Sequence, residues 1–163
     1  MAAHRKFLES NQFDVVAVPI NTTGAAVSGD WIDLKEAAGI VLYIAQGAWA
    51  GGTPAVTLNQ ATSVSGGSSK ALSFTEAWNK TGLSNTAWAA VTVTSDTFNL
   101  TATANKVTAI EIGVDQLDRD NAFTCVQLAI ASPGANADLI AAVAILYGIR
   151  NQAYPTLIDA ATV

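Results

Sequence analysis

Few side chains in this sequence could act as an acid, a base or a nucleophile in a shared site. Among 163 residues there is one histidine, His4, and one cysteine, Cys125. A Ser-His-Asp or Cys-His site needs a histidine beside its nucleophile, whereas His4 stands in a segment that we interpret as an N-terminal arm. We therefore expect no catalytic residue and no enzymatic activity. Cys125 lies in an apolar stretch, residues 123–130, and we interpret it as a small buried side chain of a strand.

The densest acidic group consists of Asp115, Asp118 and Asp120. Clustered oxygens can bind Ca²⁺, but the residues that follow do not have the ligand positions or the central glycine of an EF-hand loop. Asp and Asn side chains also bind nearby backbone amides in turns. We favour a turn over residues 118–121 that joins two strands, and we assign no metal ligand, although the sequence leaves open whether these aspartates bind an ion.

One glycine-rich segment, residues 65–70 (SGGSSK), contains a lysine but not the spacing of a phosphate-binding loop. No helical pattern follows it. We interpret the segment as a hairpin loop, and we expect no cofactor.

Four tryptophans could together form a sugar-binding platform. They are Trp31, Trp49, Trp78 and Trp88. An indole buries a large area and its N–H needs one partner, so we favour core or interface anchors over a glycan site.

The chain is poor in charge. Charged residues make up 13% of it, against about 25% in an average soluble protein. This composition favours a subunit whose surface is partly covered by neighbours, although abundant Ser, Thr, Asn and Gly offer another source of polarity.

The net charge of −5 and eight scattered Lys and Arg residues argue against a nucleic-acid partner and against electrostatic membrane binding. The longest apolar run, residues 139–149, is too short for a membrane-spanning helix. No secretion signal is visible, so we expect synthesis in a reducing cytoplasm.

Apolar segments alternate with turn-rich segments about every ten residues, a spacing typical of a sandwich or barrel. Period-two alternation, as in residues 110–115 (IEIGVD), indicates strands with one dry face. The expected strands cover residues 13–20, 30–34, 39–48, 55–64, 71–76, 87–95, 97–104, 106–117, 122–131 and 139–150.

Two segments admit a second interpretation. Residues 34–40 could hold a helical turn, and residues 138–147 could form a buried helix that begins at Asp138. For the second segment we favour a central strand, because Val143, Ile145 and Tyr147 continue a period-two row.

The two ends differ from the middle. We expect residues 1–12 to form an extended arm or short helix, residues 13–150 a single β-sandwich domain, and residues 151–163 a C-terminal arm. Apolar residues of these ends could contact neighbouring subunits, or the tail could pack on its own domain. The expected contact residues are Phe7, Leu8, Phe13, Tyr154, Leu157 and Ile158.

The order of several blocks carries a resemblance to a known family. Residues 31–35 (WIDLK) lead into an apolar strand, followed by residues 56–65 (VTLNQATSVS), residues 110–118 (IEIGVDQLD) and a closing apolar strand with a Tyr-Pro tail. Over residues 30–155 the chain resembles decoration (cement) proteins of tailed-bacteriophage heads.

This resemblance implies an all-β, jelly-roll-like sandwich on the exterior of the capsid in the virion. It implies a structural role, in which a homodimer or homotrimer bridges neighbouring subunits of the major capsid protein and stabilises the expanded shell. The alternatives are another virion component, such as a head-fibre base or tail protein, and a carbohydrate-binding module. The last requires at least two tryptophans exposed on one face.

Overall fold

The computed structural model describes residues 7–82 and 87–150, with the side chains of residues 8 and 9 excepted. One short helix, α1 (Phe7–Ser10), precedes the strands. The strands are β1 (Asn11–Asn21), β2 (Val27–Ser28), β3 (Ile32–Asp33), β4 (Gly39–Gln46), β5 (Ala55–Ala61), β6 (Lys70–Ala71), β7 (Glu76–Thr81), β8 (Ala89–Thr92), β9 (Thr97–Asn99), β10 (Lys106–Gly113), β11 (Cys125–Ile130) and β12 (Leu139–Tyr147). Two 3₁₀ turns, η1 (Val114–Gln116) and η2 (Arg119–Asn121), separate β10 from β11.

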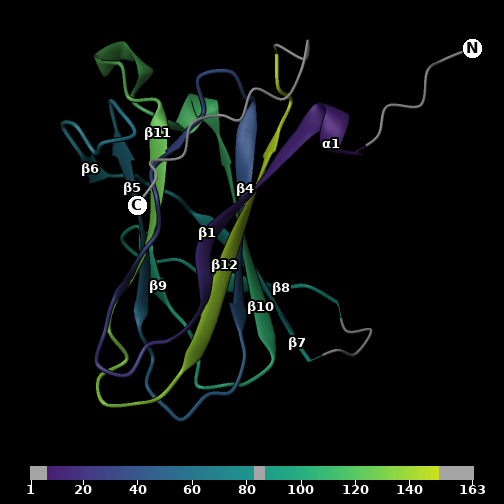
Figure 1. Ribbon diagram of the computed structural model, residues 1–163, viewed down its shortest axis with the longest axis vertical. Coiled ribbons are helices and arrows are strands. Elements are labelled where there is room, and N and C mark those ends of the chain that lie inside the picture. Colours follow the sequence, from purple (N-terminus) through teal and green to yellow (C-terminus); the bar gives the residue numbers. More distant parts are fainter. Residues whose placement is uncertain (1–6, 83–86, 151–163) are drawn as a thin grey trace, which may run out of the picture.

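The strands form two antiparallel sheets that pack face to face (Figure 1). Sheet A has the order β1-β12-β4-β10-β7-β8, and sheet B has the order β2-β11-β5-β6, with β3 beside β11 and β9 beside β5. In each sheet the strand that comes last in the sequence lies between two earlier strands. β12 lies between β1 and β4, and β11 lies between β2 and β5. This two-sheet arrangement is that of a jelly roll. The predicted all-β, jelly-roll-like sandwich is confirmed.

The core lies between the two sheets and is built by strand alternation. In β4, Ile40, Leu42 and Ile44 are at most 1% exposed, and the residues between them face outward. β10 and β12 repeat this pattern. Near one end of the core, the rings of Phe74 and Phe98 pack edge to face, with centroids 6.2 Å apart.

Residues 138–147 form a strand, as predicted, and not a helix. β12 pairs with β4 from Ile140 to Tyr147 and with β1, with irregularities, from Leu139 to Tyr147. Partners on both sides satisfy its backbone N–H and C=O groups, so the helix propensity of its alanines does not decide its conformation. Residues 34–40 contain a turn in which the Ala37 N–H donates a hydrogen bond to the Leu34 carbonyl. This turn does not extend into a helix.

The prediction of a strand over residues 97–104 is wrong beyond Asn99. There the carbonyls of Thr101 and Thr103 accept hydrogen bonds from the buried side chain of Gln46, at 3.0 and 3.4 Å. The ammonium of Lys106 donates to the hydroxyl of Thr101. Side chains thus take the place of a neighbouring strand, and the segment becomes a loop that covers the end of the core.

The prediction of a strand over residues 71–76 is also wrong. β6 ends at Ala71, and the longer strand is β7, Glu76–Thr81. Residues 79–82 (NKTG) have the composition of a turn, but β7 binds the free edge of β10 and extends sheet A.

Candidate interaction surface

The central row of the outer face of sheet A is apolar across all six of its strands. Tyr43 of β4 lies between the buried residues Leu42 and Ile44 and therefore points away from the core. Directly opposed residues in antiparallel strands share a face. The register through Tyr43 joins one row across the whole sheet, Val15, Val143, Tyr43, Ala109, Trp78 and Ala90.

The rows on either side of this central row are also mainly apolar. One contains Phe13, Ile145, Val41 and Glu111. The other contains Ala141, Ala45, Val107 and Lys80. The charged residues of these two rows are Glu111 and Lys80, which lie on opposite sides of the central row. Glu76 of β7, next to the buried Ala77, is also exposed on this face and lies on the Glu111 side. We call the three rows together the sheet A face.

The outer face of sheet B is polar by contrast. Asn59 of β5 lies opposite Gln127 of β11, and its side-chain amide donates to the Gln127 carbonyl oxygen at 3.4 Å. Thr57 of β5 lies opposite Thr97 of β9, and the hydroxyl of Thr97 donates to the carbonyl of Val56 at 3.0 Å. The two outer surfaces of the sandwich therefore suit different surroundings, water on sheet B and an apolar partner on the sheet A face.

β1 forms one edge of sheet A and presents large apolar side chains. Phe13 is 50% exposed and Val18 is 66% exposed, and Phe7 of the preceding helix is 56% exposed. The pairing of β1 with β12 is irregular between Val15 and Ile20, a segment that contains Pro19. Bulges and proline both hinder further strand addition at an edge, so side-chain contact is the mode of association that this edge favours.

The predicted contact residues divide into two groups. Phe7 and Phe13 are exposed, as a contact residue must be in the free subunit. The side chain of Leu8 and the residues Tyr154, Leu157 and Ile158 lie outside the described part of the structure. Sequence reasoning missed the sheet A face itself. Its signal is the pair of strands β4 and β12, in which both sets of alternate residues are apolar.

Tyr147 occupies the end of the sheet A face. It lies opposite Gly39 of β4, whose missing side chain leaves room for the phenol ring, and it hydrogen-bonds to Glu111 of β10. Burial, followed by this hydrogen bond and the charge of Glu111, raises the pKa of Tyr147 to about 12. The phenol therefore stays neutral over the physiological range and donates to the carboxylate.

The acidic segment forms the turn that its composition predicts. η2 spans Arg119–Asn121, and the Asn121 amide donates to both oxygens of Asp118 at 2.9 Å. Asp118 also forms an ion pair with Lys70 of β6. Hydrogen bonds from Lys70 and Asn121 lower the pKa of Asp118. Within residues 7–82 and 87–150 no group of three His, Cys, Asp or Glu side chains is placed to hold a metal ion.

Cys125 is buried in β11, as predicted. Burial raises the pKa of its thiol, so the neutral form prevails at neutral pH. The ring of nearby Phe123 lies under the ammonium of Lys70, 4.4 Å from its centroid.

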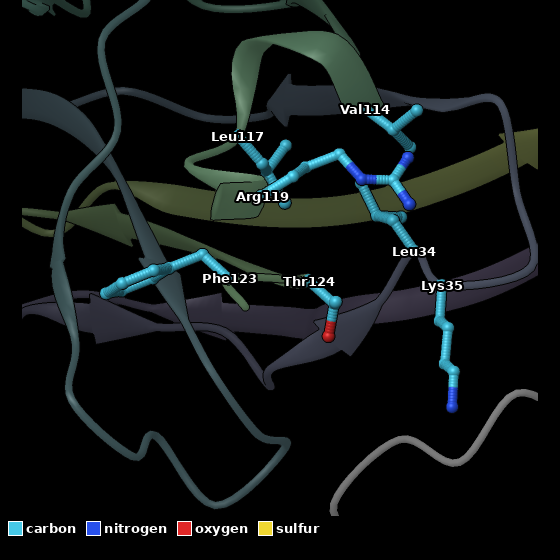
Figure 2. A pocket seen from close by; sticks show the side chains of 7 residues that line it. All are labelled: Leu34, Lys35, Val114, Leu117, Arg119, Phe123 and Thr124. Atoms are coloured by element: carbon cyan, nitrogen blue, oxygen red, sulfur yellow. The ribbon is translucent and has the colours of Figure 1, made fainter. Parts of the chain in front are cut away.

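A small hollow lies beside η1 and η2 (Figure 2). Its cavity volume is about 10 Å³, room for about one water molecule and far below the 300–1,000 Å³ or so of typical ligand pockets. Figure 2 shows the side chain of Arg119 reaching across it while the Lys35 ammonium points away. The remaining lining residues are Leu34, Val114, Leu117, Phe123 and Thr124.

Two of the four tryptophans are exposed near each other in the fold. Trp78 of β7 is 42% exposed and Trp88, just before β8, is 44% exposed. Trp78 lies opposite Ala90 of β8, and Trp88 directly precedes this strand. Trp49 instead packs against the core and donates its indole N–H to the Gly52 carbonyl at 3.2 Å.

No family model and no curated protein match this chain. Among solved structures it is similar to the SPBc2 prophage-derived protein YomS, with a TM-score of 0.47 and 10% sequence identity. The match covers 83% of this chain and 91% of YomS. Within the described residues, no helix is long and apolar enough to cross a membrane.

Proposed function

We propose that this protein is a non-enzymatic structural subunit of a tailed-bacteriophage virion, where it binds the exterior of the capsid. Its partners are the major capsid protein and further copies of itself, as a homodimer or homotrimer. It stabilises the expanded shell by bridging neighbouring capsid subunits. The block order of the sequence, which resembles decoration proteins, supports this proposal.

The observation that carries the proposal is the apolar rim formed by α1 and β1. Phe7, Phe13 and Val18 are each at least half exposed on one side of a rigid sandwich. A free subunit gains nothing from such exposure, whereas burial in an interface contributes about 25 cal/mol for each Å² removed from water. Repeated clamps on a closed shell also gain from multivalency, since each links subunits that are already neighbours.

The experiment adds purified protein to emptied, expanded capsids that lack it, and measures co-sedimentation and the melting temperature of the shell. We expect the wild-type protein to bind and to raise the melting temperature. Val18→Asp places a charge on the rim and is expected to weaken binding about tenfold or more. Ala71→Asp, which adds the same charge at an exposed position of β6, is the matched control and should bind as the wild type does. Absence of wild-type binding, or binding that leaves the melting temperature unchanged, contradicts the proposal.

A further inference from the structure

We propose that the sheet A face binds the sheet A face of a second copy of this chain and forms a two-fold symmetric dimer. This inference concerns the isolated protein and does not depend on capsid binding. It assigns an occupant to the three rows of the sheet. Of the α1 and β1 rim, Phe13 belongs to these rows, whereas Phe7 and Val18 lie outside them.

The first argument is the size of the face. Six strands about 4.8 Å apart span about 24 Å, and the three rows cover the residues from Val41 to Ala45 of β4, about 17 Å at 3.4 Å per residue. The flat footprint is thus about 400 Å², and the side chains standing on it add accessible area. Specific interfaces begin at about 1,200 Å² in total, or about 600 Å² on each partner. The three rows supply most of this area and the side chains that border them supply the rest, in the kind of sheet-on-sheet packing that already forms the core.

The second argument is the chemistry of the central row. It is apolar from Val15 to Ala90, and it contains the two aromatic side chains Tyr43 and Trp78, which are typical anchors of interfaces. Ala45 and Ala109 flank Tyr43 on the neighbouring positions. These small residues leave room beside the phenol ring for side chains of a facing sheet.

The third argument is charge complementarity. Glu111 lies in the row on one side of the central row, and Lys80 lies in the row on the other side, on the adjacent strand β7. A two-fold axis that runs along the central row, between the two facing sheets, places the Glu111 side of one copy against the Lys80 side of the other. Glu111 of each copy then faces the region of Val107 and Lys80 in the other. Each dimer would contain this pair twice, as isologous symmetry requires.

The test is the mass in solution of the full chain, measured by sedimentation equilibrium over a range of concentrations. We expect the wild-type protein to have twice the chain mass of 16.8 kDa. Tyr43→Glu and Trp78→Glu should each weaken the dimer about 30-fold or more, as loss of a central aromatic anchor does. Thr57→Glu, on the outer face of sheet B, is the matched control and should leave the dimer intact. Circular dichroism shows whether each variant folds. If Tyr43→Glu does not fold, Trp78→Glu, near the far edge of the sheet, tests the dimer instead.

A charge exchange tests the orientation of the two copies. Glu111→Lys and Lys80→Glu should each weaken self-association, whereas the chain with both changes should recover it. An equimolar mixture of the two single variants should form heterodimers, because each copy then supplies the partner charge that the other needs.

Four results would overturn the inference: a wild-type monomer, a trimer, a dimer unaffected by both aromatic variants, or a charge exchange without recovery. A glycan bound by the wild-type protein and lost on Trp78→Ala would assign the face to a sugar instead. Binding to the capsid is tested separately, because Phe7 and Val18 of the rim lie outside the three rows. A wild-type monomer would, however, remove the homodimer or homotrimer from the proposed function.

Discussion

Tyr147 and Gly39 form a matched pair on neighbouring strands of sheet A. Any side chain at Gly39 would meet the phenol ring of Tyr147, with its Cζ at 2.6 Å, and the Ile112 carbonyl at 2.7 Å. The absence of a Cβ thus allows the tyrosine to lie across β4 and reach Glu111. Sequence reasoning noticed Tyr147 as a member of an apolar row, but it could not assign this contact, because the contact depends on the register between β12, β4 and β10.

The raised pKa of Tyr147 predicts a loss of stability at alkaline pH. In the folded protein the phenol ionises at about 12, whereas in the unfolded chain it ionises at its ordinary value of 10.0. Between these values the unfolded state has lost a proton that the folded state retains, so the free energy of unfolding falls as pH rises. Its contribution is complete below pH 10.

Urea unfolding at a series of pH values measures this effect. We expect the stability of wild type to fall more steeply than that of Tyr147→Phe between pH 10 and 12. Equal slopes for the two proteins would contradict the raised pKa of Tyr147.

Gly39→Ala tests the same packing from the opposite strand. We expect it to lower the free energy of unfolding by about 2 kcal/mol, because the added methyl group overpacks a site bounded by backbone as well as by the ring. Chemical denaturation measures the change. Tyr147→Ala removes the ring, so Gly39→Ala should cost less in that background, and an equal cost in both backgrounds would contradict the proposed contact.

At the scale of elements, the long strands were predictable, whereas of the two-residue strands β3 alone lies wholly inside a predicted strand, residues 30–34. Residues 39–48, 106–117 and 139–150 contain β4, β10 and β12, because sustained apolar patterns determine them. β2, β3 and β6 have two residues each, too few for any periodicity. β7 was obscured by a turn-like composition that pairing with β10 overrides. The end of β9 depends on the Gln46 side chain, which comes from a distant part of the chain.

The apolar residues of the sheet A face are visible in the sequence, but the sequence pattern was explained by a strand position in the middle of a sheet. β12 is apolar at both sets of alternate positions, and such runs are typical of strands covered on both sides. The prediction of a central strand was right, since β12 lies between β1 and β4. In a two-layer sandwich, however, sheet B covers only one side of it. The other side is the sheet A face, for which we propose a second copy as the cover.

At the scale of the whole molecule, the sandwich has three surfaces of different character. Sheet B presents amides and hydroxyls, the sheet A face presents aliphatic and aromatic side chains, and the α1 and β1 rim presents Phe7, Phe13 and Val18. This division agrees with the low charge content, which led us to expect a subunit with covered surfaces. A dimer through the sheet A face would carry two rims, and a two-rimmed body suits a clamp between neighbouring capsid subunits.

The most direct test of the central claim is a cryo-electron reconstruction of the particle that carries this protein. The account predicts a two-sheet density on the outside of the shell, with α1 and β1 against the major capsid protein. A particle whose shell lacks this density, or a subunit that contacts the shell only through the polar face of sheet B, would contradict it.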